Sequence, residues 1–369
     1  MGVRKSDERP LPLYKQIKND ILQQIATEGL AAGDTLPTRM ELATKYNTAR
    51  ATVDRALQEL SREGVVSGTN GKRTTVVSPN AALMRIVVVW KPTDARLSRK
   101  SGEFFGDLTS GIEQACADLQ LEVHFRTAET DDCEQVMQET GARGLLALRP
   151  QYSDCVVLEH LRDKGIAVVA VPGILEEHKL PSLSSDNFMG IRQAVDHLVE
   201  LGHHSIGYVS LQATVPDQFE RIQAWFSAMQ QHHLPINPGT VCLAHENTDE
   251  SYVQVLKDWC SNATMPTAFI AGDFLMALSL LNVLQEAGIR VPEDISIVCY
   301  DDPPAAAHVA PPLTVVRQSI PTLGQRAVEN LVALIKGQAV PASERIPTEF
   351  IVRKSTARPL AVLAEPGEK

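Results

Sequence analysis

Short apolar runs separated by helical segments recur from residue 85 onward, and they constrain the fold of this 369-residue chain more than any other feature. Eight such runs occur before residue 301: RIVVVW, LEVHFR, GLLALR, IAVVAV, SIGYVS, TVCLA, TAFIA and ISIVCY. Nearly continuous apolar strands that alternate with helices are typical of parallel sheets covered on both faces. Eight strands over roughly 275 residues predict an α/β fold with two doubly wound layers rather than one.

The first 77 residues have a different pattern, which predicts three short helices followed by a hairpin. LYKQIKNDILQQI has helical spacing of its apolar residues and precedes Gly29, a common helix end. Thr38 and Glu41 have the spacing of a capping box at the start of a second helix. TARATVDRALQEL, residues 48–60, has an apolar stripe and a charged opposite face. Two β-branched runs around Asn70-Gly71 then predict a hairpin.

The formal net charge of −10 is unevenly distributed along the chain. Residues 1–80 have a net charge of +3, whereas residues 81–369 have a net charge of −13. A short helix, a turn and an amphipathic helix make a helix-turn-helix, whose second helix can enter the major groove of DNA. The hairpin would form a wing along the DNA backbone. We therefore expect double-stranded operator DNA as a partner of this small positive domain.

The segment LPLYKQIKNDILQQI…GDTLPTRMELATKYNTARATVDRALQELSREGVVSGTNGKRTTVV resembles the DNA-binding domain of the GntR family of bacterial transcription regulators over residues 11–77. Two positions depart from the family pattern, because Ala49 replaces a serine and Arg73 replaces a wing glycine. Asp54 is expected to pair with Arg50 at i, i+4 rather than to read a base. The resemblance and the basic wing tip give seven DNA-contact candidates: Arg39, Arg50, Thr52, Arg55, Gly71, Lys72 and Arg73.

Three later segments resemble the effector domain of the LacI/GalR repressors, which is similar to periplasmic sugar-binding proteins: LSSDNFMGIRQAVDHLVELGHHSIGYVS, PTAFIAGDFLMALSLLNVLQEAGIRVPEDISIVCYDD and PPLTVVRQSIPTLGQRAVENLVALIKG. The resemblance covers residues 85–358 and implies two lobes. The lobes are expected at about 85–184 with 303–337 and about 185–302 with 338–358, after a linker at 78–84 and before a tail at 359–369. With a winged helix at its N-terminus, this architecture resembles arabinose-repressor-type regulators.

The resemblance also implies a ligand site between the lobes, at the carboxyl ends of the strands. Asp273 follows the strand TAFIAG and is implied to accept ligand hydroxyls, although it would also cap the next helix. Arg221 is implied to face the ligand, with a surface ion pair as the alternative. Phe104 and Phe105 occupy the place of an aromatic stacking residue, with core packing as the alternative.

Three further ligand candidates are weaker. Asp186 follows the expected crossover between lobes, where a crossover hydrogen bond is the alternative role. Arg149 ends the run GLLALR, and Asn247 lies in HENTDES. Some relatives have an aromatic wall where this chain has Pro172-Gly173, so the identity of the effector stays open.

Other motifs do not indicate catalysis or metal binding. His203-His204 are adjacent on a loop, and Tyr300-Asp301-Asp302 is expected at a lobe crossover without a nucleophile nearby. The sequence lacks GxGxxG, P-loop, GxSxG and HExxH motifs, which disfavours an enzyme. The six cysteines contain no CxxC pair and are expected to be reduced, as in a cytoplasmic protein. We expect no cofactor.

The sequence predicts a cytoplasmic transcription factor, and the two resemblances imply that it is a homodimer. We expect a repressor that a small sugar or sugar-derived effector releases from its operator. An activator, or a regulator that needs a purine-type co-repressor, remains the alternative. A solute-binding protein is disfavoured by the missing signal peptide and by the DNA-binding segment. The chain also lacks the run of about 20 apolar residues that spans a membrane.

Overall fold

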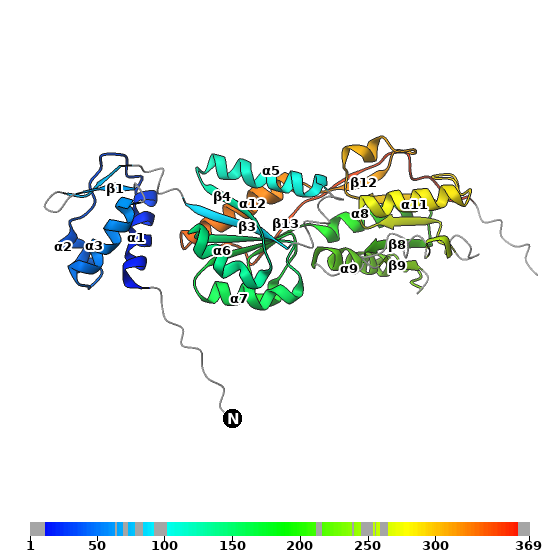
Figure 1. Ribbon diagram of the computed structural model, residues 1–369. Coiled ribbons are helices and arrows are strands. Elements are labelled where there is room, and N and C mark those ends of the chain that lie inside the picture. Colours follow the sequence, from blue (N-terminus) through cyan, green and yellow to red (C-terminus); the bar gives the residue numbers. More distant parts are fainter. Residues whose placement is uncertain are drawn as a thin grey trace, which may run out of the picture. The chain divides into compact units, whose positions relative to one another are not determined.

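The structure is a computed structural model that describes residues 12–62, 65–68, 73–77, 84–91, 102–211, 216–237, 240–244, 254, 256–258 and 265–360. The chain divides into two compact units, one formed by Met1–Arg85 with Gln120–Glu122 and the other by Ile86–Leu119 with Val123–Lys369 (Figure 1). Within the described residues, no helix has the length and apolar character needed to cross a membrane.

The first unit is a three-helix domain with a β-hairpin. Its elements are α1 (Leu13–Thr27), α2 (Arg39–Lys45), α3 (Arg50–Arg62), β1 (Val66–Ser67) and β2 (Thr75–Val76). The predicted helix signals are confirmed, since Gly29 follows α1 with φ +65° and Thr38 forms the capping box with Glu41. The chain turns at Thr48 and Ala49, and α3 begins at Arg50.

One apolar core holds these elements together. Isoleucines at helical spacing on α1 pack against buried side chains of α2, α3 and the hairpin: Ile17, Ile21, Ile25, Leu42, Val53, Ala56, Leu57, Leu60, Val66 and Val76. β1 and β2 pair antiparallel with Val66 opposite Val76, as the hairpin prediction requires. The hairpin tip with Gly71 and Lys72, and the expected linker at 78–84 except Met84, lie outside the described residues.

The second unit contains two six-stranded sheets. The first has the order β13-β7-β6-β5-β3-β4, with β3 (Arg85–Trp90), β4 (Glu122–Thr127), β5 (Gly144–Leu148), β6 (Ala167–Val171), β7 (Ser182–Ser185) and β13 (Ser343–Ile346). The second has the order β14-β12-β11-β10-β8-β9, with β8 (Ile206–Leu211), β9 (Val241–Ala244), β10 (Ala268–Ala271), β11 (Ser296–Tyr300), β12 (Thr314–Arg317) and β14 (Glu349–Ile351). All eight predicted apolar runs are strands. β7, β12, β13 and β14 were not predicted.

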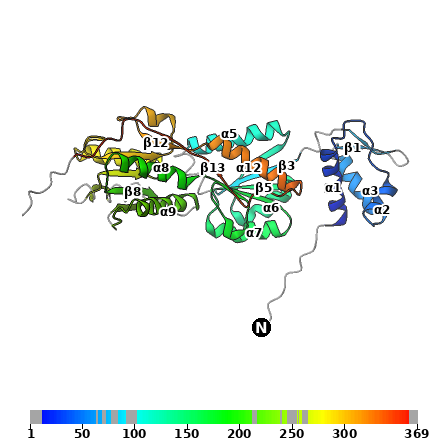
Figure 2. The same ribbon diagram turned by 180° about the vertical axis from the view of Figure 1, so that it is seen from behind.

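Helices cover both faces of each sheet (Figures 1 and 2). On the first sheet, α5 (Gly102–Asp118) and α12 (Ile320–Ile335) lie side by side, and α6 (Cys133–Thr140) and α7 (Cys155–Asp163) pack on the opposite face. On the second sheet, α8 (Asn187–Glu200) and α9 (Pro216–Gln231) cover one face and α11 (Phe274–Glu286) the other. Alternate residues of β10 enter the two cores, Ala268 and Ile270 on one side and Phe269 and Ala271 on the other. The predicted doubly wound α/β fold is therefore confirmed.

In the described residues the chain passes between the two sheets three times. It leaves β7 for α8 near Asp186, leaves β12 for α12 near Ser319, and leaves β13 for β14 near Thr348. The expected lobe boundaries after residues 302 and 337 are therefore wrong. β12 pairs with β11 in the second sheet, so the chain stays in that lobe through Arg317, and β13 extends the first sheet.

Candidate functional site

In the first unit, the starts of α2 and α3 bring two of the predicted DNA-contact arginines together. Arg39 is the first residue of α2, and its Nε donates to Asp54 Oδ1 on α3 at 2.7 Å. Arg50, the first residue of α3, places its Nε 3.7 Å from Asp54 Oδ2. The Arg39 side chain is 15% exposed and that of Arg50 is 64% exposed. The expected pairing of Asp54 with Arg50 is present, and Arg39 joins it.

The outward surface of α3 continues toward α1. The Arg55 guanidinium lies 4.0 Å from the centre of the Tyr14 ring, a cation–π contact that fixes the direction of an exposed side chain. Thr52 is half-buried near the helix start, where its amide donates to Ala49 O. Gln58 is exposed on the same helix, one turn beyond Asp54. Sequence reasoning missed Gln58, although a glutamine on this face has the donor and acceptor that match adenine.

The hairpin is tied to the turn before α2. The amides of Gly33 and Leu36 donate to Val76 O and Thr74 O, and the Val76 amide donates to Asp34 O. Arg73 is exposed at the described end of the wing. At the start of α2, hydrogen bonds from Thr38 hold the pKa of Glu41 below its usual value. Gly71 and Lys72 were predicted as contacts but lie outside the described residues.

In the second unit, Arg221 of α9 is the centre of a buried polar cluster. Its side chain is 6% exposed, and each of its three nitrogens donates a hydrogen bond. Nε donates to Asn187 Oδ1 at 3.1 Å, Nη1 to Gly272 O at 2.8 Å, and Nη2 to Asp217 Oδ2 at 3.1 Å. Its guanidinium also stacks 4.0 Å from the centre of the Tyr300 ring. Burial lowers the pKa of Arg221, but Asp217, Tyr300, Asp301 and Tyr208 together outweigh burial, so this pKa stays above its usual value. The alternative of a surface ion pair is wrong, because this pair is internal.

The cluster joins segments that are far apart in the sequence. Tyr300 OH donates to Asn187 Oδ1 at 2.8 Å, and Asn187 Nδ2 donates to Glu220 Oε2 at 2.8 Å. Arg345 of β13 reaches the same carboxylate, with Nη1 2.5 Å from Glu220 Oε1, and so links the first lobe to the second. Several buried polar atoms here have no partner among the described residues: Ser185 Oγ, Asp217 Oδ1, Gln218 Oε1 and Thr348 Oγ1.

Asp273 lies next to this cluster at the carboxyl end of β10. It is the N-cap of α11, where its Oδ1 accepts the Met276 amide at 2.9 Å, so the capping role is confirmed. Burial raises the pKa of Asp273, while the positive charges of Arg221 and Arg149 oppose that rise. Arg149 follows β5 with φ +49°, a conformation that is uncommon for a non-glycine residue. These residues bring the strand ends of both lobes into electrostatic contact.

The remaining ligand candidates are not joined to Arg221 by any described hydrogen bond. Phe105 is buried in α5 and makes an edge contact with the half-buried Phe104, with ring centres 5.7 Å apart. Asp186 caps α8 by accepting the Met189 amide, and its own amide donates to Ile346 O across a crossover. Both bonds of Asp186 match the alternative role as a crossover residue. Asn247 lies outside the described residues.

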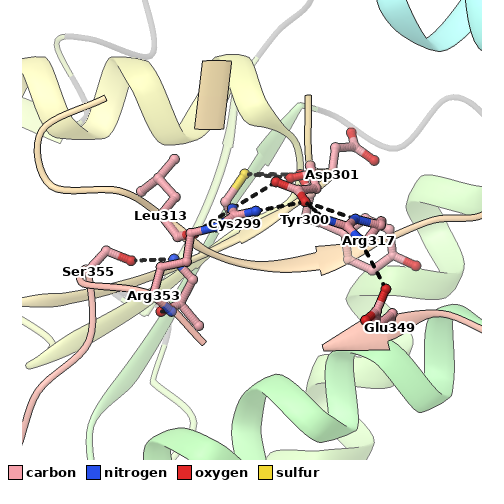
Figure 3. Close-up of polar contacts among 10 residues, drawn as sticks. Cys299, Tyr300, Asp301, Leu313, Arg317, Glu349, Arg353 and Ser355 are labelled. Carbon is pink, nitrogen blue, oxygen red and sulfur yellow. Dashed lines mark hydrogen bonds and ion pairs between the residues drawn. The ribbon is translucent and has the colours of Figure 1, made fainter. Parts of the chain in front are cut away.

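Asp301 and Asp302 have separate surroundings, and they do not lie at a lobe crossover as expected. Asp302 is held by Arg317 Nη2 at 2.6 Å and by Arg353 Nη1 and Nη2 at 2.7 and 2.9 Å. Figure 3 shows Arg317 and Arg353 converging from β12 and from the segment after β14. Burial raises the pKa of Asp302, but the hydrogen bonds and positive charges of Arg353 and Arg317 together outweigh burial and hold this pKa below its usual value. Asp302 therefore stabilises the edge of the second sheet.

Asp301 lies within electrostatic range of Arg221, a proximity that the sequence analysis did not predict. It has φ +82°, its carboxylate accepts from Gln318 Nε2, and Arg221 is the main charge that opposes the rise of its pKa by burial. The sequence could have indicated Asp301, because this residue lies directly after β11, the strand next to β10. His203, which the sequence analysis did not assign to metal binding, is buried. It is hydrogen-bonded to Thr267, Ser296 and the Ala357 carbonyl. Burial lowers the pKa of His203.

Known proteins resemble both units. Residues 13–76 match the family described as bacterial regulatory proteins, gntR family, and residues 195–356 match a periplasmic binding protein-like domain. The HTH-type transcriptional repressor PurR of Haemophilus influenzae is 34% identical over 293 residues, which are 75% of this chain and 85% of that protein. This chain belongs to the transcriptional regulators that join a GntR-type DNA-binding domain to a LacI-type effector domain.

Two further similarities cover the regulator more fully. The arabinose metabolism transcriptional repressor of Geobacillus stearothermophilus is 27% identical over 368 residues, covering 95% of the regulator and 99% of that repressor. The lac repressor dimer bound to operator and an anti-inducer shares the fold, with a TM-score of 0.65, 20% identity, and coverage of 82% of the regulator and 98% of that chain. These relatives are regulators rather than enzymes, as the sequence predicts for this chain.

Proposed function

We propose that this regulator is an operator-binding repressor controlled by a small, sugar-type effector bound beside Arg221. The observation that carries the proposal is the buried cluster of Arg221, Asn187 and Asp217, which lies next to Asp273 at the strand ends. An all-protein network would satisfy its own hydrogen bonds, because an unmet buried polar atom costs about 1–3 kcal/mol. Here Asp217 Oδ1 and Gln218 Oε1 are left without a described partner.

The chemistry of these groups favours a polyhydroxylated ligand. Asp217 and Gln218 offer acceptor oxygens. Adjacent hydroxyls of a sugar can bond to several such groups at once. Arg149 adds a half-buried guanidinium with no hydrogen bond or ion pair to the described residues, and it would suit a carboxylate or phosphate on the sugar. The named metabolism of the Geobacillus relative supports the sugar class.

The DNA side of the proposal rests on the winged helix. Arg39 begins α2, Arg50 begins α3, and Arg55 lies on the outward surface of α3, the proposed recognition helix. We propose that two copies of the chain bind a pseudo-palindromic operator, because a two-fold dimer places its helices in successive major grooves. The lac repressor, whose effector domain has the same fold, is a dimer on its operator. The proposed effector must bind the two states with different affinity, since otherwise it shifts nothing.

A two-step experiment tests the proposal with the full-length chain. Duplexes are first selected from a random pool to give an operator probe. Pentoses, hexoses, their phosphates, uronic acids, nucleosides and purines are then screened by thermal shift, where a ligand at a hundredfold excess over Kd stabilises the folded state by about 2.7 kcal/mol. Each hit is added to the protein–operator complex, and release is followed by fluorescence anisotropy.

The outcomes separate the alternatives. Release of the operator by a sugar supports a repressor with an inducer. Tighter operator binding, especially with a purine, supports a co-repressor instead. An Asp273→Asn variant keeps the helix cap, because asparagine caps as well as aspartate, but loses the carboxylate charge. An undiminished response in Asp273→Asn and Asp273→Ala together would remove Asp273 from the effector site.

A further inference from the structure

Asp54 connects the two arginines that begin α2 and α3, and this connection suggests a role in operator recognition. The inference rests on the proposed operator binding. Asp54 Oδ1 accepts from Arg39 Nε at 2.7 Å, and Asp54 Oδ2 lies 3.7 Å from Arg50 Nε. Its side chain is 32% exposed, so it lies between the covered Arg39 and the open Arg50.

The bridge orients groups that DNA binding needs. Two guanidinium groups at the starts of neighbouring helices repel each other, and a carboxylate between them offsets that repulsion. Arg39 gives one N–H to Asp54, and its terminal nitrogens have no hydrogen bond to the described residues. An arginine reads guanine through a planar fork, which must be held at a fixed angle to discriminate bases. Asp54 supplies this constraint without using the fork of Arg39.

We propose that Asp54 is a positioning residue for operator specificity. It fixes the orientation of the Arg39 and Arg50 side chains without contacting a base itself. The same carboxylate also repels DNA phosphates. Because contacts with the phosphate backbone dominate non-specific binding, Asp54 lowers the affinity for any duplex and improves discrimination between operator and other sequences. Removing its charge should raise affinity for any duplex while weakening the preference for the operator.

Asp54→Asn tests the proposal, and Glu59→Gln is a matched control. Both substitutions remove one negative charge from α3 and keep the size of the side chain. Glu59 lies 3.5 Å from Lys18 of α1, away from Arg39 and Arg50. Wild type first selects its operator from a random duplex pool. Binding of each full-length protein to that operator and to a scrambled duplex is then measured at two salt concentrations, with a thermal melt of each protein.

We expect Asp54→Asn to bind the scrambled duplex more tightly than wild type. The ratio of its affinity for the operator to its affinity for the scrambled duplex should fall about tenfold or more. A tenfold change corresponds to about 1.4 kcal/mol, which is within the range for one base contact. Glu59→Gln should change both affinities together and keep the ratio. A repeated selection with Asp54→Asn should relax at the positions that Arg39 and Arg50 contact, and the thermal melt should show that the variant is still folded.

Three results would overturn the proposal. An unchanged ratio in Asp54→Asn would show that the bridge is irrelevant to specificity. Loss of preference at a single cytosine would show that Asp54 reads that base directly, because carboxylates accept from the cytosine amino group. An equal fall of the ratio in Glu59→Gln would assign the effect to charge alone. If wild type selects no sequence from the pool, the proposed operator binding fails instead, and this outcome is seen before any variant is tested.

Discussion

Replacing Arg221 by methionine should destabilise the effector domain strongly. The Arg221 and Asp217 side chains are 6% and 8% exposed and lie 3.1 Å apart, so methionine leaves a carboxylate buried without its partner. Breaking a buried ion pair in this way costs about 3–5 kcal/mol. A loss of about 4 kcal/mol corresponds to a fall in melting temperature of about 8–16 °C for a large domain. The measurement is thermal unfolding of the full chain followed by circular dichroism.

The expected loss of stability depends on burial of the ion pair, so the control is an ion pair with an exposed arginine. Arg290 and Asp294 have the same i, i+4 spacing and lie 2.7 Å apart, but the Arg290 side chain is 65% exposed. Arg290→Met should leave the melting temperature almost unchanged. The double variant Asp217→Leu with Arg221→Met removes both charges and should melt above Arg221→Met alone. The reasoning is refuted if Arg221→Met melts with wild type, or if the double variant loses the sum of both single losses.

Three further outcomes are expected. Arg50→Ala should weaken binding to the selected operator by about 1–3 kcal/mol at fixed salt, measured by anisotropy, and unchanged affinity would remove Arg50 from the interface. Asp273→Ala should bind DNA normally, lose the effector response and melt lower, because the loss of an N-cap costs about 0.5–2 kcal/mol. Burial lowers the pKa of His203 in the folded state, whereas the unfolded value is about 6.5. The unfolding free energy should therefore fall as pH drops below about 6.5, by up to about 1.4 kcal/mol per pH unit, and His203→Asn should reduce that slope in denaturant titrations.

Local signals in the sequence predicted local structure well. The capping box of Thr38 and Glu41 needs only four consecutive residues, and the eight apolar runs need only their own composition. β7 was missed because its sequence, SLSS, is polar although all four residues are buried. Its serines are covered by neighbouring strands and by the crossover. Burial of a polar strand depends on these distant neighbours, so composition cannot predict it.

The errors in the lobe boundaries and the contacts that the sequence did not predict have the same origin. β12 (TVVR) and β13 (SERI) are each four residues long. A sequence this short does not indicate which sheet the strand joins. The pairing of Arg39 with Asp54 links residues 15 positions apart, so helical spacing predicted only the Arg50 pair. Asp301 and Asp302 are neighbours in sequence, yet Asp301 accepts from Gln318 and Asp302 is held by Arg317 and Arg353. The resemblance, by contrast, had already directed attention to Arg221 and Asp273.

The order of the last strands has a consequence for synthesis of the chain. β13 and β14 are adjacent in sequence, and each is the edge strand of a different sheet. The first sheet cannot be completed until residue 346 has left the ribosome, and the second cannot be completed until residue 351 has done so. Until then β7 and β12 present unpaired backbone edges, which are templates for wrong pairing. A premature stop near residue 340 would therefore leave both lobes open, although it removes less than a tenth of the chain.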